Sequence, residues 1–356
     1  GGRLVLINSI LTSMVLLMLS FFEVPRGVLE RIEYFRSRFF WQHDDHKKKY
    51  RLAKWDVLCQ PRDQGGMGIM NIDTQNKCLL SKWWYKLLHE QGIWQDLLRR
   101  KYMHGKAIGQ VQRKQGDSQF WTGLMKVKDL FLRFGTFQLN NGANIRFWED
   151  IWTGNSPLKQ QYPHLYRIAR HKHDTVASVF RSVPLNISFR RSLTGDNLQS
   201  WYDLVSKIAH ERLNEREDVF RWGLNQNGIF KVRTMYNAMT TGSIWSNRLL
   251  WKLKLPLKIK IFLWYLNKCV TLIKDNLVRR NWTGSTSCAF CNREETIQHL
   301  FFECHYAKFL WRALQITFGI HSPTSINDMF TSWLLALGQK RRKQIIVGAT
   351  TICWSI

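Results

Sequence analysis

The chain has 356 residues, of which 45% are apolar, so it can form two or three compact domains and is not a disordered tail. Its 53 lysines and arginines outnumber 26 acidic residues, which gives a net charge of +27. An excess of this size predicts a polyanionic partner, most often nucleic acid, over a basic surface without a specific partner. Seven cysteines without a signal-peptide pattern argue against a secreted disulfide framework and favour an intracellular location, in nucleus or cytoplasm.

The first segment, residues 4–22, is nineteen residues long and carries no charge, so its length alone permits a membrane span. At about 100° per residue, its five polar side chains fall in one sector of a helical wheel. They are Asn8, Ser9, Thr12, Ser13 and Ser20. This pattern predicts an amphipathic core helix rather than a membrane span. After a break at Pro25-Arg26-Gly27, residues 28–40 predict a second amphipathic helix.

Two short motifs in the next segment invite functional interpretations that the residues do not support. Asp44-Asp45 lies in the polar run 42–50, where adjacent side chains rarely converge on one ion, so we expect a solvated loop. Gly65-Gly66-Met67-Gly68 lacks the Gly-Lys-Ser/Thr ending of a phosphate-binding loop, and it predicts a tight turn. Residues 78–89 and 94–102 then predict helices.

The middle of the chain predicts a mixture of short elements. The turn Asn140-Asn141-Gly142 precedes a strand-like run at 145–148, and prolines at 157 and 163 mark a looser section that extends to about residue 195. Residues 220–222 and 228–232 predict two short strands around an Asn-Gln-Asn-Gly turn. Helices follow at 233–239 and from Pro256 onward. The predicted fold class is mainly α with a few short β-strands.

A metal-ligand pattern stands out at Cys288-x2-Cys291-x7-His299-x4-Cys304. Three thiolates and one imidazole fill a tetrahedral zinc shell, so we expect one structural zinc ion rather than a catalytic one. The alternative is a set of buried free cysteines near a core histidine. His299 and Cys304 fall on a predicted helix over 296–314, where five residues rotate by about 140°. Cys304 therefore needs a bent or late-starting helix, and His305 is the substitute ligand; we favour Cys304.

The residues around this pattern are basic and rich in tryptophan. Residues 228–312 hold fourteen lysines and arginines against four acidic residues. Cations for phosphates and flat rings for bases are typical of a sequence-tolerant nucleic-acid surface. Of the tryptophans, Trp264 and Trp311 follow helical apolar spacing and are predicted core residues, as are most of the seventeen in the chain. The predicted contact residues are Lys252, Lys254, Lys258, Lys260, Arg279, Arg280 and, for stacking, Trp282.

The segment 228–314 resembles the zinc-binding domain of reverse transcriptases from plant non-LTR (LINE-type) retrotransposons. The likeness rests on the runs at 228–233, 250–264, 276–280 and 295–304, and it continues at 1–22, 54–55, 65–69 and 146–150. It implies a thumb-like helical region at 1–110 after the polymerase palm and a mixed connecting region at 111–227. The zinc domain at 228–314 and a helical tail at 315–356 follow. In the tail, the basic run 340–343 is expected on an exposed turn.

The resemblance implies the four zinc ligands and descent from an RNA-directed DNA polymerase. The family's Tyr/Phe-x-Asp-Asp motif lies upstream of Gly1, and endonuclease and RNase H domains are not recognisable. We therefore expect a fragment of a longer polypeptide that is not an enzyme as it stands. The expected function is to help an upstream polymerase domain hold element RNA or target DNA, with no membrane partner. The alternatives are a zinc-pinned protein-interaction module and a decayed element without a cellular role.

Overall fold

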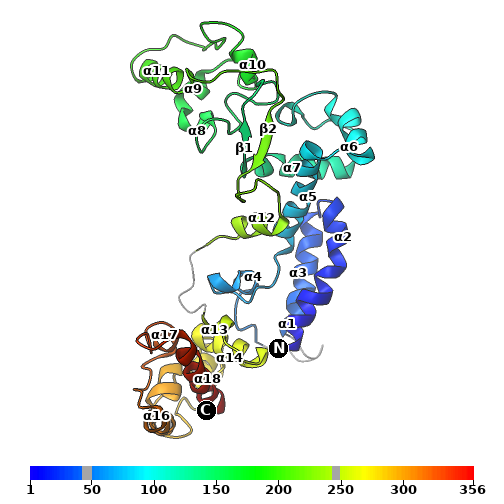
Figure 1. Cartoon of the computed structure of the whole chain (residues 1–356). Helices are drawn as coiled ribbons and strands as arrows, with labels where there is room; N and C mark the ends of the chain where they lie inside the picture. Colours follow the sequence, from blue (N-terminus) through cyan, green and yellow to red (C-terminus); the bar gives the residue numbers. More distant parts are fainter. Residues whose placement is uncertain (42–49, 243–248) are drawn as a thin grey trace. The chain divides into compact units, whose positions relative to one another are not determined.

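The computed structural model describes residues 1–41, 50–242 and 249–356 (Figure 1). The structure is mainly helical, with one two-stranded antiparallel sheet, so the predicted fold class is confirmed. Most of the predicted polar loop at 42–50, including Asp44 and Asp45, lies outside the described residues.

The chain divides into two compact units, each built from segments that are distant in the sequence. Unit 1 comprises residues 1–14, 27–71 and 240–356, and unit 2 comprises residues 15–26 and 72–239. Each unit is described by itself below. The four consecutive regions inferred from the resemblance remain a sequence-based division.

Unit 1 contains the zinc-ligand pattern, and its regular elements in the described part of the chain are all helical. Its helices and helical turns are α1 (Gly2–Leu6), η1 (Ile7–Leu11), most of α3 (Arg26–Trp41), α4 (Trp55–Cys59), η2 (Arg62–Gln64), α13 (Leu249–Lys252), α14 (Leu257–Asn267), α15 (Lys274–Val278), η5 (His299–Glu303), α16 (His305–Phe318), α17 (Ile326–Phe330) and α18 (Gln339–Ser355).

Unit 2 contains the sheet and the largest apolar core. Its elements are most of α2 (Ser13–Phe21), α5 (Ile72–His89), α6 (Ile93–Leu98), η3 (Arg99–Met103), η4 (Ile108–Gln110), α7 (Gln119–Leu132), β1 (Gly135–Gln138), α8 (Leu158–Gln161), α9 (Pro163–Ile168), α10 (Val176–Val179), α11 (Asp196–Ile208), β2 (Val219–Trp222) and α12 (Val232–Met239).

The first helical stretch, Gly2–Phe21, does not bury the face that the sequence pattern predicts. Its apolar window has a mean hydropathy of 2.2, and only 22% of that window is buried. Thr12 is 1% exposed, whereas Met14 and Leu17 are 72% and 70% exposed. Ser9 and Ser13 of the polar sector are also exposed, so this stretch leaves both polar and apolar side chains at the surface, and the prediction of a core helix is wrong. By length and composition, this is the one helix in the described residues that meets the requirements for crossing a membrane.

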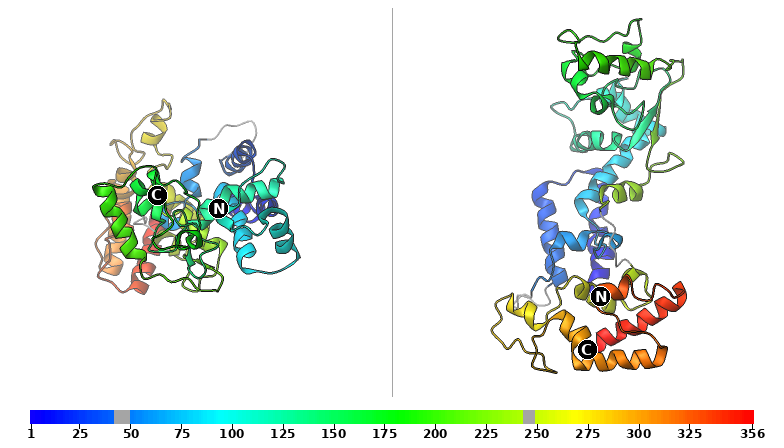
Figure 2. Two further views of the ribbon diagram at one scale, coloured as in Figure 1. Left: turned by 90° about the horizontal axis from the view of Figure 1, so that it is seen from above. Right: turned by 90° about the vertical axis from the view of Figure 1, so that its left-hand side faces the viewer.

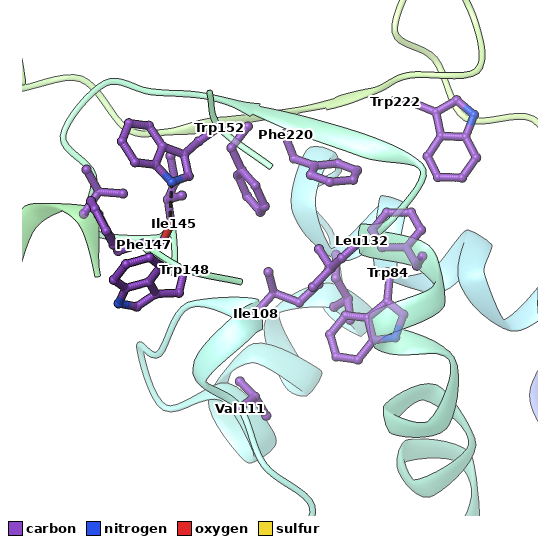
Figure 3. Packing of buried hydrophobic residues seen from close by; sticks show 14 of the residues in the cluster. Trp84, Ile108, Val111, Leu132, Ile145, Phe147, Trp148, Trp152, Phe220 and Trp222 are labelled. Carbon is purple, nitrogen blue, oxygen red and sulfur yellow. Dashed lines mark hydrogen bonds between the residues drawn. The ribbon is translucent and has the colours of Figure 1, made fainter. Parts of the chain in front are cut away.

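The core of unit 2 is rich in aromatic side chains and packs against one face of the sheet, since residues along both strands alternate between buried and exposed (Figure 3). β1 and β2 pair in antiparallel register, with Gly135 opposite Trp222 and Phe137 opposite Phe220. A Cβ atom at Gly135 would lie 2.1 Å from the Phe220 ring, so only glycine fits at this position. Trp222 stacks on Phe131 of α7 with ring centroids 5.5 Å apart, which joins the sheet to the helix.

Two strand predictions in unit 2 are wrong. The run at 145–148 makes only an isolated bridge between Arg146 and Thr175, because Phe147 and Trp148 are both buried and do not alternate between core and solvent. The segment predicted as a strand at 228–232 forms no strand, and α12 begins at Val232. The partner of β2 is β1, far earlier in the chain.

The section between residues 157 and 195 is packed rather than loose. Pro157 and Pro163 stand at the starts of the short helices α8 and α9, where a missing N–H has no cost. Leu158, Leu165 and Val176 are each no more than 1% exposed within the core of unit 2. The prolines therefore begin helices here and do not signal disorder.

In unit 1, α14 packs against both α17 and α18, and α18 also packs on α16 (Figure 2, yellow, orange and red helices). Trp264 and Trp311 are 0% and 1% exposed, so their predicted core positions are confirmed. The basic run 340–343 lies in the first turns of α18 and not on a separate turn. Arg342 donates to the carbonyl oxygens of Phe330 and Thr331 at the end of α17, which ties the start of α18 to α17.

Candidate metal centre

The first two candidate ligands lie on a short hairpin. The Cys288 amide donates to the Arg293 carbonyl oxygen at 2.8 Å, and Ser287 and Glu294 form an antiparallel bridge. The Phe290 amide also points at the Cys288 Sγ atom, 3.5 Å away. This tight turn, which two intervening residues permit, brings Cys288 and Cys291 to one side of the chain.

The other two candidate ligands stand at a break between helices. His299 opens the π-helical turn η5, and Thr296 Oγ1 accepts its backbone N–H at 3.0 Å. Cys304 ends that turn with extended backbone (φ −59°, ψ 145°), and α16 starts at His305. The helix predicted over 296–314 is therefore interrupted at Cys304. This late start provides the reach that Cys304 needs, while His305 is exposed and outside the cluster.

The ligand atoms of Cys288, Cys291, His299 and Cys304 all lie within 4.8 Å of one another. The Sγ atoms of Cys288 and Cys304 are 3.9 Å apart, close to the edge of about 3.8 Å expected for a tetrahedral zinc–thiolate site. Cys291 Sγ lies 3.1 Å from His299 Nε2. Three sulfur atoms and one imidazole nitrogen in this arrangement suit one zinc ion.

The electrostatics of the two hairpin cysteines differ. Burial raises the pKa of the Cys288 thiol, whereas the Arg293 backbone N–H lowers the pKa of Cys291. Zinc binds the thiolate form, so the Arg293 amide favours the ligating state of Cys291. A zinc ion held by all four residues would cross-link the hairpin to η5, with protein atoms at every position of a tetrahedral shell.

The hairpin is also tied to α15 by a charged pair. Lys274 Nζ lies 3.6 Å from a carboxylate oxygen of Glu295, and the Lys274 amide donates to the other oxygen at 3.1 Å. Glu295 is only 8% exposed. On the other side, the Trp311 indole donates to the Phe301 carbonyl oxygen at 2.8 Å, which fixes η5 on α16. The ligands therefore sit on a supported frame rather than on free loops.

Comparison with known proteins agrees with this geometry. Residues 230–311 match the family described as zinc-binding in reverse transcriptase. This segment is a reverse transcriptase zinc-binding domain. The match includes all four ligands, and it ends at Trp311 on α16.

Two curated proteins from Arabidopsis thaliana are similar to this chain. The "Putative ribonuclease H protein At1g65750" is 26% identical over 326 residues, which cover 87% of this chain and 52% of the relative. The "Uncharacterized mitochondrial protein AtMg00310" is 22% identical over 136 residues, which cover 38% of this chain and 88% of the relative. The chain thus spans about half the length of the first relative.

The structure separates the predicted nucleic-acid contacts into two groups. Lys252, Lys254 and Lys258 are exposed around α13 and the start of α14. Lys260 is half-buried and donates to the Trp251 carbonyl oxygen at 3.1 Å. Burial, together with Arg62, lowers the pKa of Lys260. Lys252 and Lys254 are available to phosphates, Lys258 is exposed but has its Nζ 5.7 Å from the Trp354 ring centroid, and Lys260 is engaged within unit 1.

The second group is occupied by contacts within the protein. Arg279 forms a 3.6 Å ion pair with Asp275, although its own side chain is 73% exposed. Arg280 donates to the Arg51 carbonyl oxygen and lies over the Tyr50 ring, with 5.4 Å between guanidinium carbon and ring centroid. These contacts occupy the guanidinium group and leave Arg280 less available to bind a phosphate.

Trp282 is 37% exposed, and its ring lies against Gly284, where an added Cβ atom would be 2.0 Å from it. The chain itself therefore covers part of this ring. Sequence reasoning missed two other exposed rings next to the zinc ligands in the chain, Phe290 and Tyr306. The available signal was the position of Phe290 between two zinc-ligand cysteines.

Proposed function

We propose that this chain is a non-catalytic, nucleic-acid-binding region of a retrotransposon reverse transcriptase protein, which helps to hold element RNA or target DNA inside the cell. The observation that carries the proposal is the exposure of three lysines within the zinc-binding domain, Lys252, Lys254 and Lys258. The wider setting supports it, because residues 228–312 hold fourteen basic residues against four acidic ones.

The physical basis is release of counterions from the phosphate backbone. Each neutralised phosphate contributes about −0.7 to the slope of log affinity against log salt for a single strand, and about −0.9 for duplex DNA. Three exposed lysines can therefore account for a slope of roughly −2 to −3. Such contacts carry no sequence information, which fits a region that holds nucleic acid for another domain.

The non-catalytic part of the proposal rests on the metal shell. Zinc catalysis requires a position for water or substrate, and here four protein ligands occupy the tetrahedron. The ribonuclease H in the name of the first relative belongs to a protein about twice as long as the aligned region. We propose that this chain contributes binding to such a protein.

A salt titration tests the proposal. The zinc-loaded chain is titrated with single-stranded RNA and with duplex DNA at several salt concentrations, as wild type and as the triple variant Lys252→Gln, Lys254→Gln, Lys258→Gln. We expect the slope for RNA to become shallower by about 2 in the triple variant. The matched control neutralises the exposed residues Lys340, Arg341 and Lys343 at the start of α18, and it should change the slope less. Wild-type affinity that does not fall with salt would contradict the proposal.

A further inference from the structure

Two aromatic rings stack on each other beside the zinc ligands and remain exposed. The centroids of Phe290 and Tyr306 are 4.6 Å apart, and the ring planes differ by 12°. Phe290 is 50% exposed and Tyr306 is 40% exposed. A stacked pair covers one face of each ring, so the remaining exposure belongs to the outer faces and the edges.

The metal site holds both rings in place. Phe290 lies between Cys288 and Cys291 on the hairpin, with its amide directed at the Cys288 sulfur. Tyr306 follows Cys304 by two residues, in the first turn of α16. Because the zinc ligands belong to both segments, one metal ion fixes the two rings relative to each other. The pair is thus preorganised without being buried.

This pair fits a base better than a phosphate. The exposed charges nearest in sequence are balanced, with Arg293 and Lys308 against Glu294 and Glu303. The unbalanced charge lies instead on Lys252, Lys254 and Lys258 of the same unit. A nucleic-acid strand held through its phosphates by those lysines carries bases, whose flat faces match an exposed aromatic stack.

We propose that Phe290 and Tyr306 form a stacking platform for an unpaired base of single-stranded nucleic acid. The proposal rests on the proposed nucleic-acid-binding function and names its preferred ligand. Duplex bases are already stacked on their neighbours, so the platform discriminates in favour of single strands. It takes the role that the sequence pattern assigned to Trp282, whose ring is partly covered by Gly284. Phe309, 70% exposed and three residues after Tyr306, extends the aromatic surface along α16.

The test uses the zinc-loaded full chain and three variants, Phe290→Leu, Tyr306→Leu and the control Phe318→Leu. Phe318 is 49% exposed and ends α16, twelve residues beyond Tyr306, so the control removes a ring of equal exposure from the same helix. The probes are a single-stranded RNA, the same strand with one abasic position, and the duplex. Zinc content is measured for each protein. If Phe290→Leu loses the metal, Tyr306→Leu alone tests the platform.

We expect either platform variant to lose about 5- to 100-fold in affinity for the single strand, with an unchanged salt slope and unchanged duplex binding. Wild type should bind the abasic strand more weakly than the intact strand, whereas a platform variant should bind the two strands with similar affinity. Phe318→Leu should match wild type. Salt-dependent wild-type binding that neither platform variant weakens by more than twofold overturns the platform and leaves the proposed function standing. An equal loss for the single strand and duplex also overturns the platform. No salt-dependent binding by wild type overturns the proposed function itself.

Discussion

Trp264 donates its indole N–H to the Gly65 carbonyl oxygen, 2.9 Å away, and so joins α14 to a loop 199 residues earlier in the chain. The loop is held tightly, because a Cβ atom at Gly66 would lie 1.9 Å from the Gln60 carbonyl oxygen. The glycine cluster that lacks a phosphate-binding ending is therefore a packing turn. Part of the zinc-binding domain thus packs on the early segment of unit 1 through a hydrogen bond from a buried indole to this glycine turn.

The first prediction concerns this contact. Trp264→Phe removes the N–H and leaves the buried Gly65 carbonyl without its partner, so we expect a loss of about 1–3 kcal/mol. The midpoint temperature of thermal unfolding should fall by roughly 2–4 °C for each kcal/mol lost in a unit of this size. Trp354→Phe, at a ring that is 45% exposed, is the matched control and should change the midpoint little. Equal midpoints for the two variants would contradict the importance of the contact.

The metal site gives a second prediction. Metal analysis of protein purified without chelator should find about one zinc per chain. Cys291→Ser should lose the metal and unfold the zinc-binding domain, because metal binding and folding are coupled in such sites. Circular dichroism and zinc content measured on the same samples check both effects.

The fourth ligand is tested separately by comparing Cys304→Ser with His305→Ala. Cys304 belongs to the cluster and is 1% exposed, whereas His305 is exposed and starts α16. We expect zinc loss only in Cys304→Ser. Retention of a full equivalent by that variant, with loss in His305→Ala, would reverse the assignment.

Thiol reactivity gives a third prediction, because the seven cysteines differ in exposure and pKa. Cys269 is exposed, whereas burial raises the pKa of Cys78 to about 12. At pH 7.5, the zinc-loaded protein should alkylate first at Cys269. After chelation, Cys291 should react before Cys288, because its pKa is lowered and it is less buried. Cys78, in the core of unit 2, should remain unmodified.

Mass spectrometry of peptides over a time course identifies which thiols have reacted. Protection of the ligand cysteines should return when zinc is added back, but not when magnesium is added, because thiolates prefer the softer metal. Labelling of Cys291 at one rate with and without chelator would argue against metal binding.

The sequence was most informative where the structure depends on short-range spacing. Cys288 to Cys304 spans seventeen residues, and two-residue separation of cysteines is enough to predict a hairpin that presents two sulfur atoms. Helical geometry also predicted that the helix must bend or start late for Cys304 to reach the metal. Residues 28–40 and 78–89 likewise gave helices, now seen as Arg26–Trp41 and Ile72–His89, because their apolar spacing is local.

The remaining features depend on contacts that no local pattern contains. β2 pairs with β1, which lies more than eighty residues away, and the adjacent loop is held by Asp218. The carboxylate of Asp218 accepts from the amides of Asn140, Gly142 and Asn144 at 2.8–3.0 Å. The turn at 140–142 was predictable from its own residues, but the side chain that stabilises it lies far away in the sequence.

Exposure of single side chains was equally difficult to predict. Trp282 lies in a polar loop, yet its ring packs on Gly284, and the apolar side chain of Leu17 is exposed while Thr12 is buried. Both outcomes depend on which surfaces meet in the fold, and composition alone does not determine that. The predicted nucleic-acid contacts therefore agree less well with the structure than the predicted metal ligands do.

A buried charge network in unit 2 leads to the last prediction. Arg146 contacts Glu149 at 2.7 Å and Asp150 at 2.8 Å, and all three side chains are no more than 10% exposed. Burial alone raises the pKa of Glu149, but Arg146, His173 and Tyr166 together hold it below the ordinary value of 4.5. The pKa is therefore lower in the folded state than in the unfolded state.

Glu149→Gln should lower the free energy of unfolding at pH 7 by about 1–3 kcal/mol, because it removes a charge-assisted hydrogen bond from a buried arginine. A depressed folded-state pKa stabilises the protein above the unfolded-state pKa and loses that effect as pH falls through the folded-state value. The difference in unfolding free energy between wild type and variant should thus be present at pH 7 and shrink as the pH falls below about 4.5. Urea unfolding at pH 7, 5 and 3.5 measures it. Asp96→Asn, which breaks the exposed pair with Arg99, is the control and should cost less than about 1 kcal/mol. A deficit of Glu149→Gln that persists undiminished at pH 3.5 would show that lost packing, and not lost charge, explains the effect.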